Sequence, residues 1–408
     1  MSHQSQRVNF HVSLRAAVSA LVIVFVQIVA ATTAAQGQTF KIIYSFTGGQ
    51  DGEGPESGLV RDNFGNMYGT TELRGSGGHG TVFKFRNTGS GWVLSPLYEF
   101  AGGAAEGGFP LGVTVGPDGT LYGTTLYGGN DFCDNGCGVV FHLKPPLTPP
   151  KSVLSPWKED FPHMFDGGYT PSSNVIFGPS GEMYGATDTT IYELVPTSGG
   201  WNLNTLYTFK NLPDGYMPTN VALDDAGDLY GTTARGGNSG CLPGNGCGTV
   251  FKLTHTETGW TKTILYTFQS GADGGLPWGP LVVGPTGRLY GTTTSYGVGG
   301  GGTVFELVPS GGGWTFSTLC SFTGGGGPNG SLVPDGKGSY IATTHADGVG
   351  DGTVFKFTPS DGGGSCSTVW TSMGEVGFPG DNLVIDANGN IFGTSDGGRN
   401  GFIWEITP

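Results

Sequence analysis

One short pattern recurs seven times along the chain, and it constrains the fold more than any other feature. Its most regular copies are LYGTT at residues 121–125, 229–233 and 289–293, each followed by a glycine-rich loop and then by TVF or VVF. The variants MYGTT, MYGAT, YIATT and IFGTS begin at Met67, Met183, Tyr340 and Ile391, so successive copies start 46 to 62 residues apart. Self-similarity with such a period is typical of propellers, solenoids and other repeat architectures.

Each repeat has the pattern of four short strands joined in sequence. An apolar run and a turn precede LYGTT, as in LVVGPTGRLY (281–290), and an alternating run such as WTKTILYTF (260–268) follows TVFKL. A tight hairpin needs positive φ at little steric cost, and the turns carry Gly65, Gly119, Gly181, Gly227, Gly287, Gly338 and Gly389. Seven four-stranded meanders predict an all-β, seven-bladed β-propeller of antiparallel blades. A β-helix or an array of stacked sheets is the alternative.

The two ends of the repeat region are complementary. FKIIYSF (40–46) matches the fourth strand of a unit and FIWEIT (402–407) matches the third, so the seventh unit lacks its own fourth strand. Pairing the N-terminal strand with the last unit would close the ring and cover a free strand edge. We therefore expect residues 36–408 to form a single propeller domain that is closed by its N-terminal strand.

Residues 1–35 have the composition of a signal peptide. Arg7 and Arg15 precede an apolar run from Ala16 to Ala31, and small residues follow, with a cleavage point after Ala35. The run is shorter than the roughly 20 residues of a membrane span. We expect cleavage, export and no stable membrane insertion; a retained anchor helix is the alternative.

The chain is acidic, with 32 Asp and Glu against 18 Lys and Arg and a formal charge of −14. Binding to phosphates needs clustered basic side chains, so we expect no nucleic acid or anionic membrane as a partner. The charge is compatible with cation binding or with simple solubility, and we expect a monomer.

The two most regular copies resemble a known repeat family. DLYGTTARGGNSGCLPGNGCGTVFKLT (228–254) and RLYGTTTSYGVGGGGTVFELVP (288–309) are similar to repeats of the bacterial extracellular GloVer family, also called the Gloeo/Verruco repeat. The resemblance extends from Phe40 to Pro408. It implies a secreted, periplasmic or cell-surface protein of a bacterium, and it brings no established catalytic motif. A second resemblance, of architecture alone, is to seven-bladed lyases of the streptogramin-inactivating type.

An acidic residue recurs a few positions ahead of a proline, where one unit connects to the next. Ring closure would place on one face the six acids Asp51, Glu106, Asp166, Asp214, Asp273 and Glu375. Ca²⁺ prefers carboxylates together with loop carbonyls, so calcium is the candidate cofactor. The alternative is that each acid caps its own turn.

The cysteines fall into three groups. Cys133 with Cys137, and Cys241 with Cys247, are close in sequence, and in an exported protein such spacing predicts two local disulfides. Cys320 and Cys366 belong to outer-strand segments of neighbouring units. Whether this third group pairs stays open.

Candidate catalytic and binding residues lie in the loops. His79 and His345 occupy the same loop of the first and sixth units, and with Glu72 or Asp347 they would supply a general base beside a carboxylate-held metal ion. Ordinary solvated loop histidines are the alternative. The candidate aromatic residues, which would stack on sugars or instead plug their own loops, are Phe109, Tyr169, Tyr216 and Trp278.

These patterns favour a non-catalytic binding or display module whose ligand is a glycan or a cell-surface protein on the loop-rich face. The competing class is an extracellular lyase or hydrolase that uses His79, His345 and nearby carboxylates. A purely structural role in the cell envelope is a third interpretation.

Overall fold

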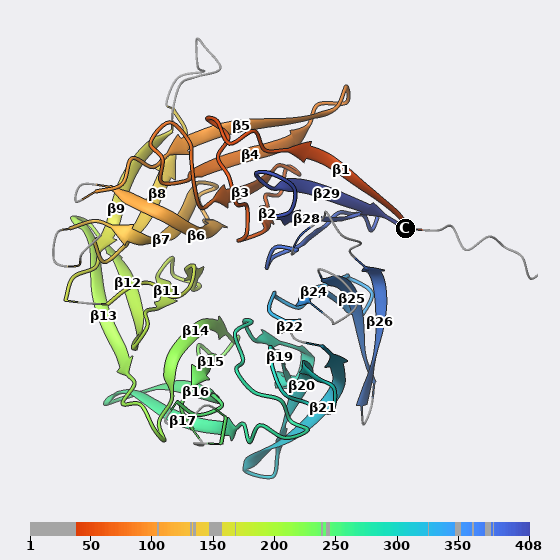
Figure 1. Cartoon of the computed structure of the whole chain (residues 1–408). Coiled ribbons are helices and arrows are strands. Elements are labelled where there is room, and N and C mark those ends of the chain that lie inside the picture. Colours follow the sequence, from red (N-terminus) through yellow and green to blue (C-terminus); the bar gives the residue numbers. More distant parts are fainter. Residues whose placement is uncertain are drawn as a thin grey trace, which may run out of the picture. The chain divides into compact units, whose positions relative to one another are not determined.

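The computed structural model shows a ring of seven β-sheets formed by residues Phe40–Thr407 (Figure 1). It describes residues 38–408 except for 104–105, 131–132, 134–135, 147–156, 168, 238–239, 242–244, 325, 347–351, 361–362, 372–376 and 378. The prediction of an all-β, seven-bladed β-propeller is confirmed. The predicted signal peptide, residues 1–35, lies outside the described residues.

Each sheet is an antiparallel blade, and in the first six blades the strands follow the chain outward from the ring axis. The first three blades are β2 (Leu59–Arg61), β3 (Met67–Thr71), β4 (Thr81–Asn87) and β5 (Trp92–Glu99); β6 (Gly107–Val115), β7 (Leu121–Gly128), β8 (Val139–Lys144) and β9 (Lys158–Met164); and β10 (Ile176–Phe177), β11 (Met183–Ala186), β12 (Thr190–Thr197) and β13 (Gly200–Thr208). The next three are β14 (Tyr216–Leu223), β15 (Leu229–Arg235), β16 (Thr249–Thr256) and β17 (Gly259–Thr267); β18 (Val282–Val283), β19 (Leu289–Thr293), β20 (Gly300–Ser310) and β21 (Gly313–Thr323); and β22 (Gly326–Pro328), β23 (Val333–Pro334), β24 (Tyr340–Ala346), β25 (Thr353–Ser360) and β26 (Gly363–Thr371). In the sixth blade the innermost strand is interrupted, since β22 and β23 both pair with β24. A 3-10 turn, η1 (Pro285–Gly287), joins β18 to β19.

The seventh blade joins the two ends of the ring. It consists of β27 (Val384–Ile385), β28 (Ile391–Ser395), β29 (Phe402–Thr407) and β1 (Thr39–Ser45), with β1 on the outside. Figure 1 shows β1 and β29, the first and last strands of the chain, side by side. The predicted closure by the N-terminal strand is therefore confirmed.

The glycine of LYGTT makes room for the aromatic ring of TVF. Gly231 on β15 stands opposite Phe251 on β16, and Gly291 on β19 stands opposite Phe305 on β20. A Cβ atom at either glycine would come within 3.0 Å of the phenyl ring. Both rings are fully buried. This contact explains why the two sequence segments always occur together.

The two threonines of LYGTT have different partners. The hydroxyl of Thr233 lies 2.8 Å from that of Thr249 on the next strand, and it accepts a hydrogen bond from the Thr249 amide. The first threonine reaches out of its blade: Thr124 donates a hydrogen bond to the carbonyl of Ser173 in the next blade, at 2.8 Å. One threonine thus fixes the blade internally and the other joins neighbouring blades.

The outermost strands of adjacent blades meet at one repeated position. The residue opposite the valine or isoleucine of the third strand (Tyr98, Tyr207, Tyr266, Cys320, Trp370) contacts the outer strand of the next blade. The contacts are a Tyr98–Glu159 hydrogen bond, a Lys262 ammonium 5.2 Å from the Tyr207 ring, stacking of Tyr266 on Phe316 at 3.9 Å, the Cys320–Cys366 disulfide, and stacking of Trp370 on Phe40 at 4.2 Å. The same position is therefore filled by four kinds of interaction in five blades: a hydrogen bond, a cation over a ring, stacked aromatic rings and a disulfide.

All three cysteine pairs form disulfides. The predicted bonds Cys133–Cys137 and Cys241–Cys247 are confirmed, and each ties one short loop. The third, Cys320–Cys366, links β21 to β26 across a blade boundary, with a sequence separation of 46 residues. The pairing that the sequence left open is thus settled by the fold.

We expect the inter-blade disulfide to stabilise the protein more than a local one. In the chain-entropy description, a loop of this length contributes about 4 kcal/mol and the Cys133–Cys137 loop about 2 kcal/mol. The pair of substitutions Cys320→Ala and Cys366→Ala should lower the midpoint of denaturant unfolding more than Cys133→Ala with Cys137→Ala. Equal midpoints for the two variants would contradict this ranking.

Glu159 on β9 carries a partly buried carboxyl group at a blade boundary. Tyr98 donates its hydroxyl hydrogen to one oxygen, and the other oxygen, Oε1, is buried without a hydrogen-bond partner. Burial raises the pKa of Glu159 to about 8, and the nearby carboxylates of Glu106 and Asp160 raise it further, although the Tyr98 bond opposes them. The folded state therefore binds this proton more tightly than the unfolded state does.

This linkage predicts a loss of stability with rising pH. Between the unfolded pKa near 4.5 and the folded value near 8, the folded state holds more protons, so the free energy of unfolding decreases as pH rises. We expect Glu159→Gln to remove on the order of 1 kcal/mol of that decrease, measured by urea unfolding at several pH values. Glu257→Gln, at an exposed turn, is the control, and identical pH profiles for natural protein and Glu159→Gln would refute the assignment.

Candidate functional site

A polar pocket lies on the ring axis at the end where the blades connect. Its volume is about 210 Å³, and every blade contributes to its wall. In blade order, the lining side chains are Ser57, Leu111, Ser173, Thr219, Trp278, Asn329 and Asp381. We call this pocket, with the side chains around it, the mouth.

Below the mouth the axis widens into a larger chamber of about 960 Å³. Asn174, Asn220, Ser331 and Asn382 line both spaces, so a ring of amides and a hydroxyl separates them. The wall below consists of the innermost strands β2, β6, β10, β14, β18, β23 and β27. The residues that line the mouth are therefore mostly polar, and those that line the chamber below it are mostly apolar.

His345 lies at the mouth, near the end of β24. Its Nε2 atom is 3.5 Å from Oδ1 of Asp381, and the Asn329 amide donates a hydrogen bond to the same carboxylate at 3.1 Å. The amide nitrogen is also 3.4 Å from His345 Nε2. Asp381 raises the pKa of His345 more than burial lowers it. These three residues form a hydrogen-bonded group on blades six and seven.

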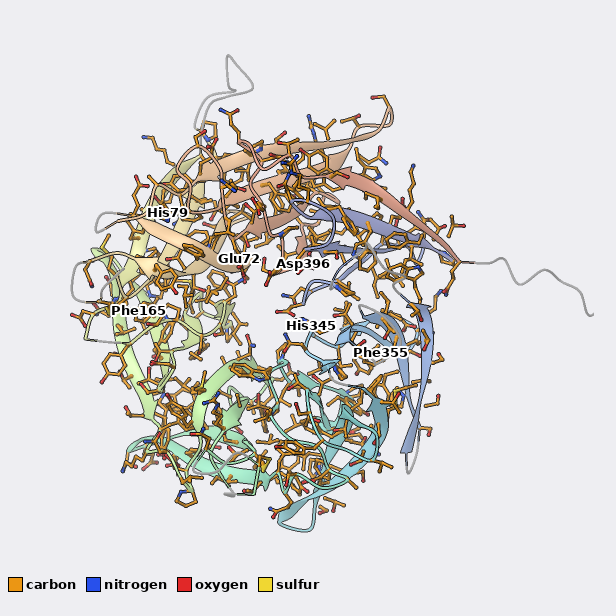
Figure 2. The ribbon with its side chains drawn as sticks, in the orientation of Figure 1. Glu72, His79, Phe165, His345, Phe355 and Asp396 are labelled. Carbon is orange, nitrogen blue, oxygen red and sulfur yellow. A yellow bond between two sulfur atoms is a disulfide. The ribbon has the colours of Figure 1, made fainter. Side chains whose placement is uncertain are left out.

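Further carboxylates face this group from the first and seventh blades. Figure 2 shows Glu72, Asp396 and His345 around the central opening. Burial raises the pKa of Glu72 to about 7, with contributions from Glu56, Asp381 and Asp396. Burial and the same aspartates also raise the pKa of Glu56. Of the groups around the mouth, Glu72 thus changes its protonation near neutral pH.

Two register positions of the repeat supply most of these side chains. The residue after the threonine pair is Glu72, His345 and Asp396 in the first, sixth and seventh blades. The residue after the connecting proline is Glu56, Trp278 and Asn329 in the first, fifth and sixth blades. The scaffold residues beside them hardly vary between repeats. Glu72 and His345 were named from sequence, whereas Glu56, Asn329, Asp381 and Asp396 were missed. Variation at these two positions was the signal.

The structure does not bring His79 and His345 together. His79 packs its ring 6.1 Å from Phe109 at the boundary of the first two blades, away from His345 in Figure 2. Asp347, one of the two carboxylates predicted beside these histidines, lies outside the described residues. A site formed jointly by the two histidines therefore has no geometric support.

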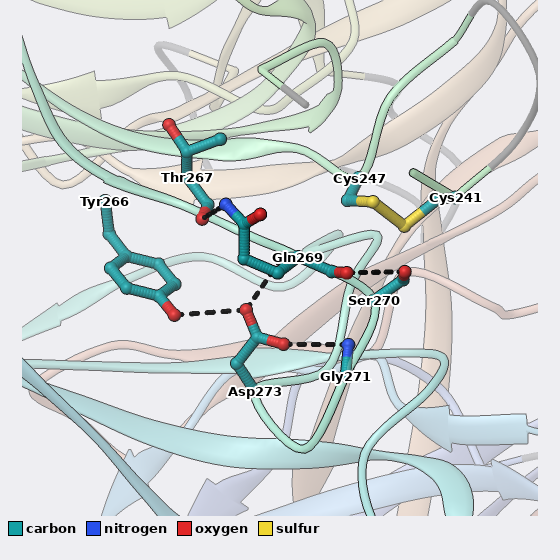
Figure 3. The surroundings of a disulfide bond; sticks show 8 residues. All are labelled: Cys241, Cys247, Tyr266, Thr267, Gln269, Ser270, Gly271 and Asp273. Atoms are coloured by element: carbon teal, nitrogen blue, oxygen red, sulfur yellow. Dashed lines mark hydrogen bonds between the residues drawn. A yellow bond between two sulfur atoms is a disulfide. The ribbon is translucent and has the colours of Figure 1, made fainter. Parts of the chain in front are cut away.

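Four of the six recurring acids are held by hydrogen bonds, mostly from their own turns. Asp273 accepts hydrogen bonds from the Tyr266 hydroxyl and from the amides of Gln269 and Gly271 (Figure 3). Asp51 accepts similar hydrogen bonds within its turn. Asp214 accepts hydrogen bonds from the Tyr207 hydroxyl, the Lys210 amide and the Lys262 ammonium. Glu106 accepts one from the Ala101 amide. Asp166 occupies the corresponding turn after β9, and Glu375 lies outside the described residues. Within the described part of the chain, no three His, Cys, Asp or Glu side chains are arranged to hold a metal ion.

The predicted aromatic residues lie in different surroundings. Phe109 packs against His79 and Tyr127, and Tyr216 belongs to the β14–β15 ladder opposite Arg235. Tyr169 is 44% exposed in its loop, and Trp278 is 36% exposed. Of the four, Trp278 lines the mouth.

Comparison with known proteins identifies a repeat family and a fold. A family model described as the Gloeobacter/Verrucomicrobia repeat matches residues 28–189 and 186–405. The curated proteins contain no sequence match to the chain. Among the described residues there is no helix with the length and hydropathy of a membrane span.

Two solved structures show the fold relationship. Virginiamycin B lyase from Staphylococcus aureus has 14% sequence identity and a TM-score of 0.54, over 91% of this chain and 99% of that one. The extracellular domain of BT4673 from B. thetaiotaomicron has 13% identity and a TM-score of 0.55, over 91% of this chain and 40% of that one. At such identities the likeness concerns the fold alone.

The contact between His345 and Asp381 makes a testable prediction. Asp381→Asn removes the negative charge that favours the imidazolium, so the pKa of His345 should fall. An NMR titration of the His345 ring proton measures the change. Asp386→Asn, in the β27–β28 turn of the same blade, removes an equal charge from a carboxylate bonded to Asn388 and Asn390. It should leave the titration unchanged; an equal shift in both variants would rule out the direct contact.

Proposed function

The chain belongs to the Gloeobacter/Verrucomicrobia repeat family, and we propose that it acts as an exported, non-catalytic binding module that holds a glycan at the mouth. The fold supplies a rigid closed ring, and the side chains that differ between repeats gather at one end of its axis. Binding residues are commonly carried by loops and strand ends on such a scaffold.

The observation that carries this proposal is the position of Trp278. A second pocket of about 340 Å³ lies beside the mouth, and Trp278 and Asn329 line both. Thr294, Ser295 and His345 complete the polar part of its wall. A large aromatic face next to hydroxyl, amide and imidazole groups suits a ligand with both apolar C–H faces and many hydroxyls. A sugar ring has this character.

The negative charge around the mouth restricts the chemical class of glycan that we expect to bind. Four carboxylates, those of Glu56, Glu72, Asp381 and Asp396, influence one another around the mouth, and the whole chain is acidic. An anionic sugar would be repelled at this end of the channel. We therefore expect a neutral or amino sugar as ligand, in preference to a uronic acid or a sulfated chain.

Export is supported by the covalent structure. All six cysteines pair in three disulfides, and disulfides form and persist mainly in oxidising compartments outside the cytosol. The predicted signal peptide agrees with this location. Glycans of cell surfaces are accessible there.

A second candidate function is supported by one specific observation at the same place. Glu72, with a pKa raised to about 7, and the His345–Asp381 pair would together provide a proton donor and acceptor for a lyase or hydrolase. Incubation of the bound glycan with the protein distinguishes the two functions. A catalyst would release shortened or unsaturated products and lose this activity in His345→Ala, whereas a binding module would return the glycan unchanged.

Removal of the exposed tryptophan should weaken glycan binding. An aromatic contact of about 1.4 kcal/mol corresponds to a tenfold change in affinity, so Trp278→Ala should raise the Kd for a glycan selected on an array about tenfold. Phe64→Ala is the matched control, because Phe64 is 93% exposed in the β2–β3 turn at the opposite end of the blade. Equal affinities for natural protein and Trp278→Ala in calorimetric titrations would exclude the mouth as the glycan site.

A further inference from the structure

We propose that the mouth receives the end of a glycan chain and does not bind a segment from its middle. This inference rests on the proposed function and specifies which part of the ligand the site recognises. It follows from the closure of the ring, the size of the mouth and the change of polarity along the channel.

Closure of the ring leaves the axial pocket without a lateral opening. Side chains from all seven blades surround the mouth, and β1 pairs with β29 where the first and last parts of the chain meet. The first and seventh blades are also joined beside the mouth, since the Asn382 amide donates a hydrogen bond to the Ser57 carbonyl at 3.0 Å. An extended polymer therefore cannot slide in sideways and reaches the mouth only along the axis, which requires a free end.

The size of the mouth suits one terminal unit. Its 210 Å³ lies below the roughly 300 to 1,000 Å³ of typical small-molecule pockets. The adjoining pocket between the fifth and sixth blades shares Trp278 and Asn329 with it, and His345 is also part of its wall. A terminal sugar in the mouth would thus place the next unit against Trp278 in the adjoining pocket.

The change from polar to apolar lining below the mouth keeps the terminal sugar unit in the mouth. Asn174, Asn220 and Asn382 offer amide donors and acceptors directly below the mouth. Deeper in the chamber the lining includes Val60, Ile176 and Val282, which cannot hydrogen-bond with hydroxyls. A hydroxyl-rich chain loses hydrogen bonds if it passes below the amides, so the end of the chain stops there.

The test uses one glycan that binds on the array, prepared as short oligomers and as long polymer of the same linkage. Calorimetric titration gives the Kd per chain and the number of proteins bound per chain. If the end is recognised, both values stay constant as the chain grows. If internal units are recognised, a tenfold longer chain binds about ten times as many proteins, and this result would overturn the inference while the proposed function stands. Absence of binding to every glycan would overturn both.

A pair of variants tests the axial pocket independently of chain length. Leu111→Trp places a bulky ring in the mouth and leaves Trp278 and His345 of the adjoining pocket in place. We expect at least a tenfold rise in the Kd for the oligomer. Leu203→Trp, on the outer strand β13, where Leu203 is 38% exposed, should bind normally. Unfolding midpoints verify that both variants fold. If Leu111→Trp folds and binds as well as Leu203→Trp, the ligand lies across the face and the inference fails.

Discussion

The contact between a second-strand glycine and a third-strand aromatic ring is the constraint on which the whole ring depends. In every blade except the sixth a glycine faces Phe, Tyr or Trp across the ladder, and in the sixth blade Ala342 faces Phe355. Because the aromatic ring lies close to the glycine backbone, the two residues together form a thin, buried layer within each blade. Leu, Val and Tyr from the neighbouring blade can then pack against that layer, as in the cluster of Tyr230, Leu289 and Phe305.

A scaffold with such a uniform interior tolerates variety elsewhere. At the outer blade boundary the same slot holds a hydrogen bond, a cation over a ring, stacked aromatics or a disulfide. At the mouth, the residues after the threonine pair and after the connecting proline differ from blade to blade. The positions at the outer boundary hold neighbouring blades together, and the positions at the mouth supply polar and ionisable side chains around the axis. Selection can change either set without disturbing the glycine–aromatic layer.

The features of the fold that recur in every repeat could be predicted from the sequence. Contacts that occur between only one pair of blades could not. The period and the turn glycines predict the blade number because they recur in all seven repeats, and the unpaired strand at each end predicts the closure. The Cys320–Cys366 bond depends on the register between two outer strands, and no local pattern of one repeat contains it. For the site, Glu72 and His345 were visible as ionisable loop residues, but Asp381 and Asn329 joined them through the connections between blades. His79, farther along the same kind of loop as His345, points to a different neighbourhood.

The pairing of β1 with β29 also sets an order of events during synthesis. A chain is made from its N-terminus, so β1 appears first and its partner β29 appears last. Until then the first strand has an open edge, and the six intervening blades can form without a closed circle. The closed ring, and with it the axial pocket enclosed by all seven blades, forms only when the last strand has been made. Completion of synthesis is in this way a physical condition for the axial pocket to exist.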